Sequence, residues 1–389
     1  MIKSKIMLVI PHMTIGGVQK TLISALRAID YGKYDVTLYL RKNRTQLLKF
    51  VDERVKIIVN EDPNRYYRKP FAIALQCKSL IYKLLGQKEK SAATDRILAD
   101  RICKAEMAYE KKTYFSNVKY DHAIAYVQGY TALFVDQCIE ADKKIIFYHT
   151  STNDLPEIHK EVLPRFNKIA ALHEEQRELI GEWYPEHRTK IQLVENYTDR
   201  EMILSQSREY EVANDSGVTV LCSCGRFAPV KGFDLAAEAA RLLRDKGVEF
   251  IWYFVGDGPE RPAVEQLISK YNLQSKVVFT GMKENPYPYM LACDIYVQPS
   301  YQEAVGLTML EAHRLNRPVV TTATVGGAKL VSDGENGAVC DISAQALADT
   351  VETLIKNKQL FDKIKENLAQ TDYSREFEKY KQQWKELLE

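Results

Sequence analysis

The 389-residue sequence lacks the features that mark several classes of protein. No hydrophobic run approaches the roughly 20 residues that a membrane-spanning helix needs. The N-terminal stretch MIKSKIMLVIPHM has an apolar core too short for a secretion signal and no small-residue cleavage site, so it reads as a first buried strand. No internal repeat or low-complexity segment occurs. We therefore expect a globular, cytoplasmic protein.

Two kinds of metal-binding pattern are also missing. The seven cysteines are scattered without the spacing of a metal site, and their odd number favours reduced, mostly buried thiols in a cytosolic protein. Cys222 and Cys224 share one face of a strand, so we expect both in the core. No Asp-x-Asp occurs, so a metal–diphosphate site of that kind lacks its usual ligand pair. We expect no bound metal and no cofactor.

The balance of charge differs between the two halves of the chain. Residues 1–200 hold 33 Lys and Arg against 25 Asp and Glu, a net of +8, whereas residues 201–389 hold 21 against 27, a net of −6. Residues 1–112 alone hold 23 basic and 11 acidic residues, a net of +12. Such a region suits an anionic partner, which is a membrane surface, a phospholipid-linked acceptor or nucleic acid. No nucleic-acid motif accompanies it, so we favour the membrane and expect no nucleic-acid partner.

Both halves have the strand and helix pattern of α/β domains, and the length suits two of roughly 150 to 200 residues each. In the first half, apolar runs predict strands near 5–10, 35–40, 55–59, 122–127, 144–149, 169–172 and 191–196. From Val218 onward, strands and helices alternate, which predicts a parallel sheet with right-handed crossovers.

Polar and turn-forming residues predict where the domains end. We expect a first domain over 1–200, a linker over 201–217, a second domain over 218–370 and a C-terminal helix over 371–389. That helix carries an aromatic stripe of Phe377, Tyr380 and Trp384.

The segment PSYQEAVGLTMLEAHRLNRPVV is the most informative in the chain. Its helix should begin near Gly306 and Leu307, directly after a buried strand, so that the amides of Gly306, Leu307 and Thr308 favour an anion. Glu303 lies in the loop before this helix, where it can reach sugar hydroxyls, and Glu311 lies more than a turn inside, where it can reach a ribose. Taken alone, this pair of glutamates also fits a solvated helix surface.

A second segment, VTVLCSCGRFAPVKGFDLAAEAARLL, places two cations after a β-branched strand. Arg226 and Lys231 lie in its loop, at the strand end where ligands bind in open α/β sheets. Arg with its planar fork and Lys as a point charge could clamp a diphosphate. The alternative is two exposed loop cations without a ligand.

Together these segments resemble the retaining glycosyltransferases of family 4, within glycosyl transferases group 1, whose pattern is G-R-x(4)-K-G followed by E-x(7)-E. Here these motifs are GRFAPVKG and EAVGLTMLE, with VGDGPERPAVEQL and VVFTGMKENPYPYMLACDIYVQPS between them and GGVQKTLISAL near the N-terminus. The sequence departs from the pattern at Ala304 and Val305, where the family has Gly-Phe, and in the stretch Gly326, Gly327, Ala328 and Lys329, where the family's Gly-Gly-x-x-Glu motif is without its glutamate. We therefore assign no ligand contact to Lys329.

The resemblance implies a GT-B fold, with two Rossmann-like domains facing across a cleft and a last helix that crosses back onto the first domain. The alternative is a last helix packed only on its own domain. It also implies that His149, at the end of a strand, lies beside the donor sugar. It implies further donor-binding residues at the ends of three other strands, namely Gly16, Gly17, Gly256, Gly281 and Met282.

The function that the resemblance implies is transfer of a hexose-type sugar, with retention, from a UDP-sugar to a hydroxyl of a glycan or lipid-linked acceptor. Arg226, Lys231, Glu303 and His149 are then the catalytic residues, and the setting is cell-surface polysaccharide or glycoconjugate synthesis at the inner face of the membrane. Two alternatives remain open: a non-catalytic GT-B partner subunit and a GT-B sugar-nucleotide epimerase.

The basic first domain contains one segment suited to a membrane surface. Residues 65–90 combine apolar side chains with lysines, as in a helix that lies in the plane of an anionic bilayer. The apolar residues are Phe71, Leu75, Ile81, Leu84 and Leu85, and the lysines are Lys69, Lys78, Lys83 and Lys88. The alternative is that the apolar face packs on the first domain and the lysines are solvated.

Overall fold

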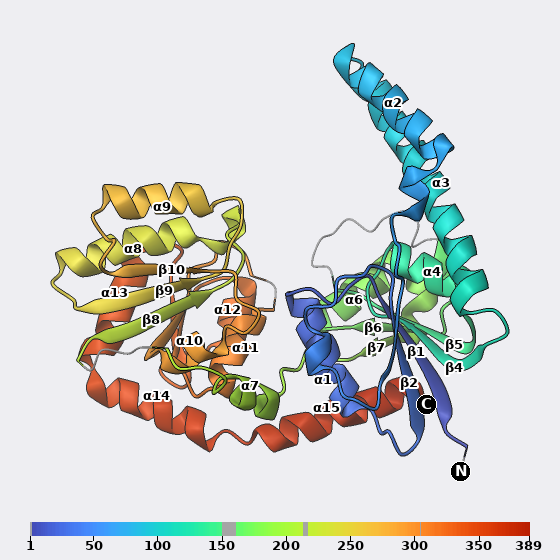
Figure 1. The fold of residues 1–389 in the computed structure, drawn as a ribbon. Helices are drawn as coiled ribbons and strands as arrows, with labels where there is room; N and C mark the ends of the chain where they lie inside the picture. The colour runs from blue at the N-terminus through green and yellow to red at the C-terminus, as the bar shows by residue number, and fades with distance from the viewer. Residues whose placement is uncertain (1, 150–160, 213–216, 304) are drawn as a thin grey trace. The chain divides into compact units, whose positions relative to one another are not determined.

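The computed structural model describes residues 2–149, 161–212, 217–303 and 305–389. The chain forms two compact units. Unit 1 comprises Met1–Tyr197 with Lys379–Glu389, and unit 2 comprises Thr198–Glu378. Each unit contains one parallel β-sheet with helices packed against it (Figure 1).

The sheet of unit 1 has seven parallel strands in the order β3-β2-β1-β4-β5-β6-β7. Their bounds are β1 Ser4–Ile10, β2 Tyr34–Leu40, β3 Lys56–Val59, β4 Lys119–Ala125, β5 Glu140–Phe147, β6 Lys168–Ala171 and β7 Ile191–Leu193. The central strands read as near-continuous apolar runs because helices bury both faces of a parallel sheet. All seven strands overlap the predicted apolar runs, although β4 and β5 begin three and four residues earlier than predicted and β7 ends three residues earlier.

The helices of unit 1 connect these strands. The α-helices are α1 Gly17–Ala28, α2 Pro70–Leu84, α3 Lys88–Tyr114, α4 Tyr130–Cys138 and α6 Glu174–Trp183, with short 3₁₀ turns at Leu48–Phe50, Arg65–Arg68, Leu163–Arg165 and Pro185–Lys190. The lower part of α3 packs on α4 and buries Met107 in the core, whereas α2 and the upper part of α3 form an antiparallel pair that projects from the unit (Figure 1).

The sheet of unit 2 has six strands in the order β10-β9-β8-β11-β12-β13. Their bounds are β8 Thr219–Cys224, β9 Phe250–Val255, β10 Val277–Gly281, β11 Ile295–Gln298, β12 Val319–Thr322 and β13 Gly337–Cys340. The helices are α7 Arg200–Gln206, α8 Phe233–Asp245, α9 Arg261–Lys270, α10 Tyr287–Ala292, α11 Leu307–Arg314, α12 Val325–Leu330, α13 Ala344–Lys356 and α14 Lys358–Gln370. Strands and helices alternate as predicted from Val218 onward.

One apolar cluster covers each face of this sheet. The larger cluster includes residues of α8, α9 and α13, and the other includes residues of α7, α10 and α11. Cys222 is fully buried in the second cluster, as expected, whereas Cys224 at the strand end is only half-buried.

The segment expected to be a linker, 201–217, begins with a helix instead. Helix α7 starts where the Asp199 side chain accepts a hydrogen bond from the Met202 amide at 2.8 Å, which caps its N-terminus. Ile203 then packs into unit 2 with the residues of α10 and α11. One buried apolar side chain in a polar sequence gives little periodic signal, which is why the segment resembled a linker. Residues 213–216 lie outside the described residues.

The last helix, α15 Tyr373–Leu388, is divided between the units. The Tyr373 hydroxyl donates to the His313 carbonyl at 2.8 Å within unit 2. Within unit 1, Trp384 is buried and stacks on Phe147 at 5.3 Å, and Tyr380 stacks on Tyr197 at 5.1 Å between ring centroids. In the described ranges, no helix is both long and apolar enough to cross a bilayer.

The packing of α15 predicts that Trp384 stabilises unit 1. We expect Trp384→Ala to lower the free energy of unfolding of this unit by about 3–5 kcal/mol, because the cavity adds to the lost burial. Lys385→Ala, on the exposed side of the same helix, should change it by less than about 0.5 kcal/mol. Urea unfolding followed by circular dichroism measures both, and equal stability of the two variants would contradict the packing described.

Candidate functional site

The candidate residues of unit 2 gather at the carboxyl edge of its sheet. Strands β8 and β11 are neighbours, and the strand order reverses between them, since β9 and β10 lie on one side and β12 and β13 on the other. Ligands of open α/β sheets bind outside the carboxyl ends of the strands at such a point. The loops after β8 and β11 carry Arg226, Lys231 and Glu303.

A glycine brings these two loops into direct contact. Gly232 has a φ of 65°, and a Cβ added there would lie 1.9 Å from the carbonyl oxygen of Pro299. The amides of Tyr301 and Gln302 donate to the Val230 carbonyl at 2.9 and 3.2 Å. A side chain at position 232 would therefore separate the loop after β8 from the loop after β11.

The contact between the loops aligns a cation with a carboxylate. The Lys231 ammonium lies 2.6 Å from Glu303 Oε2, and the side chains are 27% and 12% exposed. This half-buried ion pair places opposite charges on the two loops at the point where the strand order reverses. The two residues, 72 positions apart in sequence, are therefore brought into direct contact, and their roles at a donor site remain predictions.

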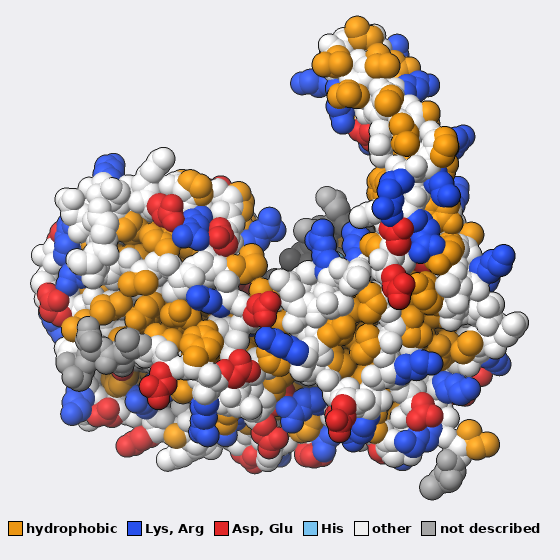
Figure 2. Space-filling model, viewed as in Figure 1, with side chains coloured by type: hydrophobic (Ala, Val, Ile, Leu, Met, Phe, Trp, Pro, Cys, Tyr) orange, Lys and Arg blue, Asp and Glu red, His pale blue; other side chains and the backbone are white. Residues whose placement is uncertain are grey.

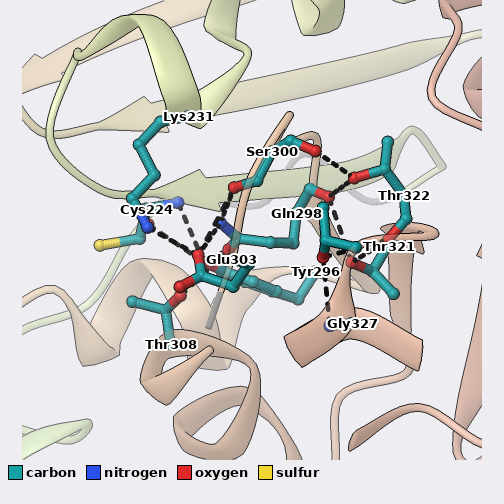
Figure 3. A network of polar contacts seen from close by, with 11 residues as sticks. Cys224, Lys231, Tyr296, Gln298, Ser300, Glu303, Thr308, Thr321, Thr322 and Gly327 are labelled. Atoms are coloured by element: carbon teal, nitrogen blue, oxygen red, sulfur yellow. Dashed lines mark hydrogen bonds and ion pairs between the residues drawn. The ribbon is translucent and has the colours of Figure 1, made fainter. Parts of the chain in front are cut away.

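A buried glutamine, Gln298 at the end of β11, organises the surroundings of Glu303 (Figure 3). Its amide nitrogen donates to Ser300 Oγ at 2.7 Å and to Glu303 Oε2 at 3.3 Å. Its carbonyl oxygen accepts from the hydroxyls of Tyr296 and Thr308, each at 3.0 Å. Gln298 therefore fixes both the carboxylate and the first turn of the next helix.

Sequence reasoning did not identify Gln298 as a site residue. The available signal was a polar side chain at the end of an otherwise apolar strand, directly before a proline. Buried polar groups need hydrogen-bond partners, so a polar residue in that position implies a local network.

Helix α11 begins where it was predicted. Its N-cap is Gly306, with a φ of 70°, where an added Cβ would lie 2.1 Å from Met309 Cε. No described residue accepts a hydrogen bond from the amides of Gly306, Leu307 or Thr308. These amides and the helix dipole make the loop favourable for an anion. Ala304, the first departure from the family pattern, lies outside the described residues.

Glu311 lies one turn further into α11 and is buried, with 1% of its surface exposed. Its Oε1 accepts a hydrogen bond from the Tyr287 hydroxyl of α10 at 3.0 Å. With Glu303 nearly buried as well, the alternative of two solvated surface glutamates is wrong. After Gln298, Tyr287 is the second residue of the candidate site that the sequence did not reveal.

Arg226 is exposed in the loop after β8, and within the described ranges it has no ion-pair or hydrogen-bond partner for its side chain. Its neighbour Phe227 anchors the loop, with its ring 3.9 Å from that of Phe233 between centroids and its amide bonded to the Asp257 carbonyl at 3.0 Å. The backbone at Arg226 is thus fixed while its guanidinium faces solvent. A ligand contact for it remains a prediction.

The other predicted donor residues of unit 2 lie along the same edge. Gly256 follows β9 and Gly281 ends β10, and the Gly256 amide donates to the Gly281 carbonyl at 3.0 Å. Met282, directly after Gly281, is largely exposed. The strand order β10-β9-β8 brings this pair of glycines beside the Arg226 loop.

The remaining candidates lie in unit 1, also at the carboxyl edge of the sheet. Gly16 and Gly17 follow β1 at the start of α1, and His149 follows β5. The strand order reverses between β1 and β4, so this edge has its own switch point. Tyr126, after β4, links the two positions, because its ring centroid lies 4.9 Å from that of His149 and its hydroxyl donates to Thr21 Oγ1 of α1 at 3.3 Å.

The imidazole of His149 is packed among aromatic rings. Burial lowers its pKa to about 4, so the ring is neutral at pH 7. The backbone amide of His149 donates to Gln128 Oε1 at 3.0 Å, and its Nε2 is buried without a hydrogen-bond partner among the described residues. A neutral ring nitrogen in this state can donate to or accept from a ligand hydroxyl, depending on the tautomer. Residues 150–160, next in the chain, are outside the described residues.

Solved structures resemble this chain over its whole length, whereas the family model and the curated relatives match only part of its sequence. Residues 208–371 match the family model of glycosyl transferases group 1. The lipopolysaccharide core biosynthesis glycosyltransferase LpsE of Rhizobium meliloti is 30% identical over 191 residues, which are 48% of this chain and 55% of that protein. The alpha-D-kanosaminyltransferase of Streptomyces kanamyceticus is 34% identical over 148 residues, 37% of this chain and 38% of that protein. The chain thus spans about half or less of the length of these curated relatives.

The structural likeness extends over both units. The crystal structure of Anabaena Alr3699/HepE in complex with UDP and glucose has a TM-score of 0.70, at 18% identity, over 99% of both chains. Because the two sheets, their strand orders and the helices between them are those of a GT-B protein, the predicted fold class is confirmed. The chain therefore has the GT-B fold, and its residues 208–371 are similar to the group 1 glycosyltransferases.

Proposed function

We propose that this protein is a retaining glycosyltransferase of family 4 that moves a hexose-type sugar from a UDP-sugar to an acceptor hydroxyl. The observation that supports this proposal most strongly is the ion pair between Lys231 and Glu303. It lies beside the amides of Leu307 and Thr308, at the point where the strand order of the sheet reverses. The role of LpsE in lipopolysaccharide core biosynthesis and the UDP and glucose bound to HepE support the choice of substrates. We propose a glycan or lipid-linked acceptor in surface polysaccharide or glycoconjugate synthesis, on the cytoplasmic side.

The diphosphate is the part of the donor that this site suits best. Arg226 and Lys231 supply two positive charges on one loop, and the first turn of α11 supplies amides and the positive end of a helix dipole. The attraction between each of these groups and the diphosphate strengthens as the UDP leaving group gains negative charge. They would stabilise the transition state more than the bound donor, which is the condition for catalysis.

The two glutamates are assigned to the sugar and the ribose. Glu303 accepts from Gln298 and pairs with Lys231, so its carboxylate is held next to the diphosphate position, where it can accept from sugar hydroxyls. Glu311, oriented by Tyr287, is assigned to the ribose hydroxyls. Gly256, Gly281 and Met282 are assigned to the nucleotide.

Unit 1 contributes His149, Gly16 and Gly17 to our proposal. His149 is neutral at pH 7, which suits a hydrogen bond to a sugar hydroxyl rather than an ion pair with phosphate. The two glycines would let the backbone approach the donor closely at the start of α1.

Retention fits attack on the same face as the departing phosphate. The bond between sugar C1 and the phosphate oxygen breaks, the acceptor oxygen bonds to C1 on the same face, and the acceptor proton passes to a leaving phosphate oxygen. The protein's contribution is orientation and stabilisation of the charge that develops on UDP.

UDP should stabilise the protein against heat. A ligand present at 100 times its dissociation constant adds about 2.7 kcal/mol, and we expect this from UDP and UDP-sugars but not from GDP or ADP at equal concentration. A thermal-shift screen measures it. Stabilisation by UDP without turnover of any donor would support the partner-subunit alternative, and a changed sugar without an acceptor would support the epimerase. The absence of any nucleotide effect would contradict our proposal.

Removing either cation should reduce turnover more than donor affinity. We expect Arg226→Ala and Lys231→Ala to lower kcat by about 100-fold, because each removes a charge-assisted contact that strengthens in the transition state. Lys270→Ala, an exposed lysine in the same unit, is the matched control and should keep wild-type turnover. Initial rates of UDP release at several donor concentrations separate kcat from KM. Near-normal turnover of both site variants would place the donor elsewhere.

Glu303→Gln should also impair transfer without unfolding the protein. The amide keeps the shape and the contact with Gln298 but removes the negative charge that pairs with Lys231, so we expect about a 100-fold loss of kcat with an unchanged melting temperature. Excess chelator should leave wild-type turnover unchanged, since the proposed diphosphate contacts are cations and amides. Inhibition by chelator that Mg²⁺ reverses would contradict this assignment.

A further inference from the structure

The helical pair α2–α3 is the most exposed part of unit 1. In α2, Pro70–Leu84, only Ala72 and Ser79 are buried. They face α3, where Leu98 and Ile102 complete a small apolar cluster with Ala72, and Ser79 Oγ lies 2.9 Å from Ser91 Oγ. Most of the surface of α2 is therefore left to solvent.

The exposed surface at the tip of this pair is rich in large apolar side chains, which is unusual for a solvated helix. Large hydrophobic side chains crowd its tip, where Leu84 is 79% and Leu85 is 64% exposed, and Leu80 and Ile81 are also more than half exposed. Figure 2 shows the hydrophobic side chains gathered at this end with basic side chains around them. Exposed apolar patches of this kind mark interaction surfaces.

The structure corrects the position of the apolar surface expected from the sequence. Phe71 and Leu75 pack against the cluster of Ala72, Leu98 and Ile102, so they are not available to a partner. The inclusion of Phe71 and Leu75 in the exposed apolar face is therefore wrong. The most exposed apolar side chains lie instead at the far end of α2 and beside the turn at Gly86, whose φ is 70°, whereas Ile73 and Ile97, nearer the base of the pair, are 49% and 50% exposed.

The charge of the pair selects the kind of partner. Residues 65–104 hold ten Lys and Arg against three Asp and Glu, a net of +7. Lys78, Lys88 and Lys90 are exposed around the apolar tip, and Lys83 pairs with Asp95 at 3.2 Å. A second copy of this chain docked on the same surface would bring +7 against +7. An anionic lipid surface satisfies both the apolar tip and the lysines.

We propose that the tip of the α2–α3 pair inserts into the headgroup boundary of a bilayer that contains anionic phospholipid. Leu80, Ile81, Leu84 and Leu85 enter the acyl boundary, and the lysines contact lipid phosphates. Only the tip inserts. The apolar contact between the two helices is small and is formed around Ala72, Leu98 and Ile102, and the part of α3 that follows it packs in the core of unit 1. This proposal does not depend on the reaction proposed above and can fail without it.

Co-sedimentation of the full chain with vesicles tests the proposal. We expect binding to vesicles of phosphatidylglycerol mixed with phosphatidylcholine, weaker binding at high salt, and much weaker binding to phosphatidylcholine alone. Leu84→Ser with Leu85→Ser should lower the partition coefficient at least tenfold. Lys78→Glu with Lys88→Glu should lower it by at least about 30-fold. All four side chains are exposed, so neither variant removes a packed group.

Matched variants in unit 2 control for general surface effects. Val278→Ser with Ile342→Ser removes two exposed apolar side chains from that unit. Lys270→Glu reverses the charge of an exposed lysine. The Lys270 ammonium lies 5.6 Å from the centre of a tyrosine ring, as the Lys78 ammonium lies 5.8 Å from that of Tyr82. Both controls should bind like wild type. Three results would overturn the proposal: no vesicle binding, equal loss in tip and control variants, or a wild-type oligomer that Leu84→Ser with Leu85→Ser dissociates while vesicles stay unbound.

Discussion

The ion pair between Lys231 and Glu303 is the interaction on which the site of unit 2 depends. It joins the loop after β8 to the loop after β11 across the point where the strand order reverses. A half-buried pair of this kind contributes little to stability by itself, because desolvation of both charges offsets their attraction. The pair acts by holding two charges of opposite sign side by side, next to the first turn of α11.

The surroundings of this pair explain why it is held so firmly. Gly232 lets the two loops touch, and Gln298 bonds to Glu303 on one side and to Thr308 of α11 on the other. The backbone of Gly326 in α12 donates to the Glu303 carbonyl at 2.8 Å, which anchors the loop from a third element. Side chains fixed in this way need little rearrangement when charge develops on a ligand. Arg226, by contrast, is exposed and anchored only through its backbone and Phe227.

Much of this arrangement follows from the sequence because it is local or periodic. The strands appear as apolar runs, and the start of α11 is set by Gly306 directly after the loop that follows β11. That Lys231 and Glu303 both lie at the carboxyl ends of strands could be predicted, whereas their direct contact depends on β8 and β11 being neighbours, which the structure shows. The roles of Gln298 and Tyr287 could not, since their partners come from tertiary contacts that leave no repeat in the sequence. Helix α7 was missed for a related reason: a single buried Ile203 gives no amphipathic pattern. The α2–α3 segment was recognised as apolar and basic, but which of its apolar residues pack and which stay exposed depends on the neighbouring helix.

The central claim is that the carboxyl edge of unit 2 at β8 and β11 is a UDP-sugar site. The most direct measurement is a crystal structure of the protein with a UDP-sugar bound. Our account predicts a diphosphate on the amides of Leu307 and Thr308, between Arg226 and Lys231, with Glu303 at the sugar hydroxyls and Glu311 at the ribose. A nucleotide bound away from this edge, or a diphosphate that contacts neither cation, would contradict the account.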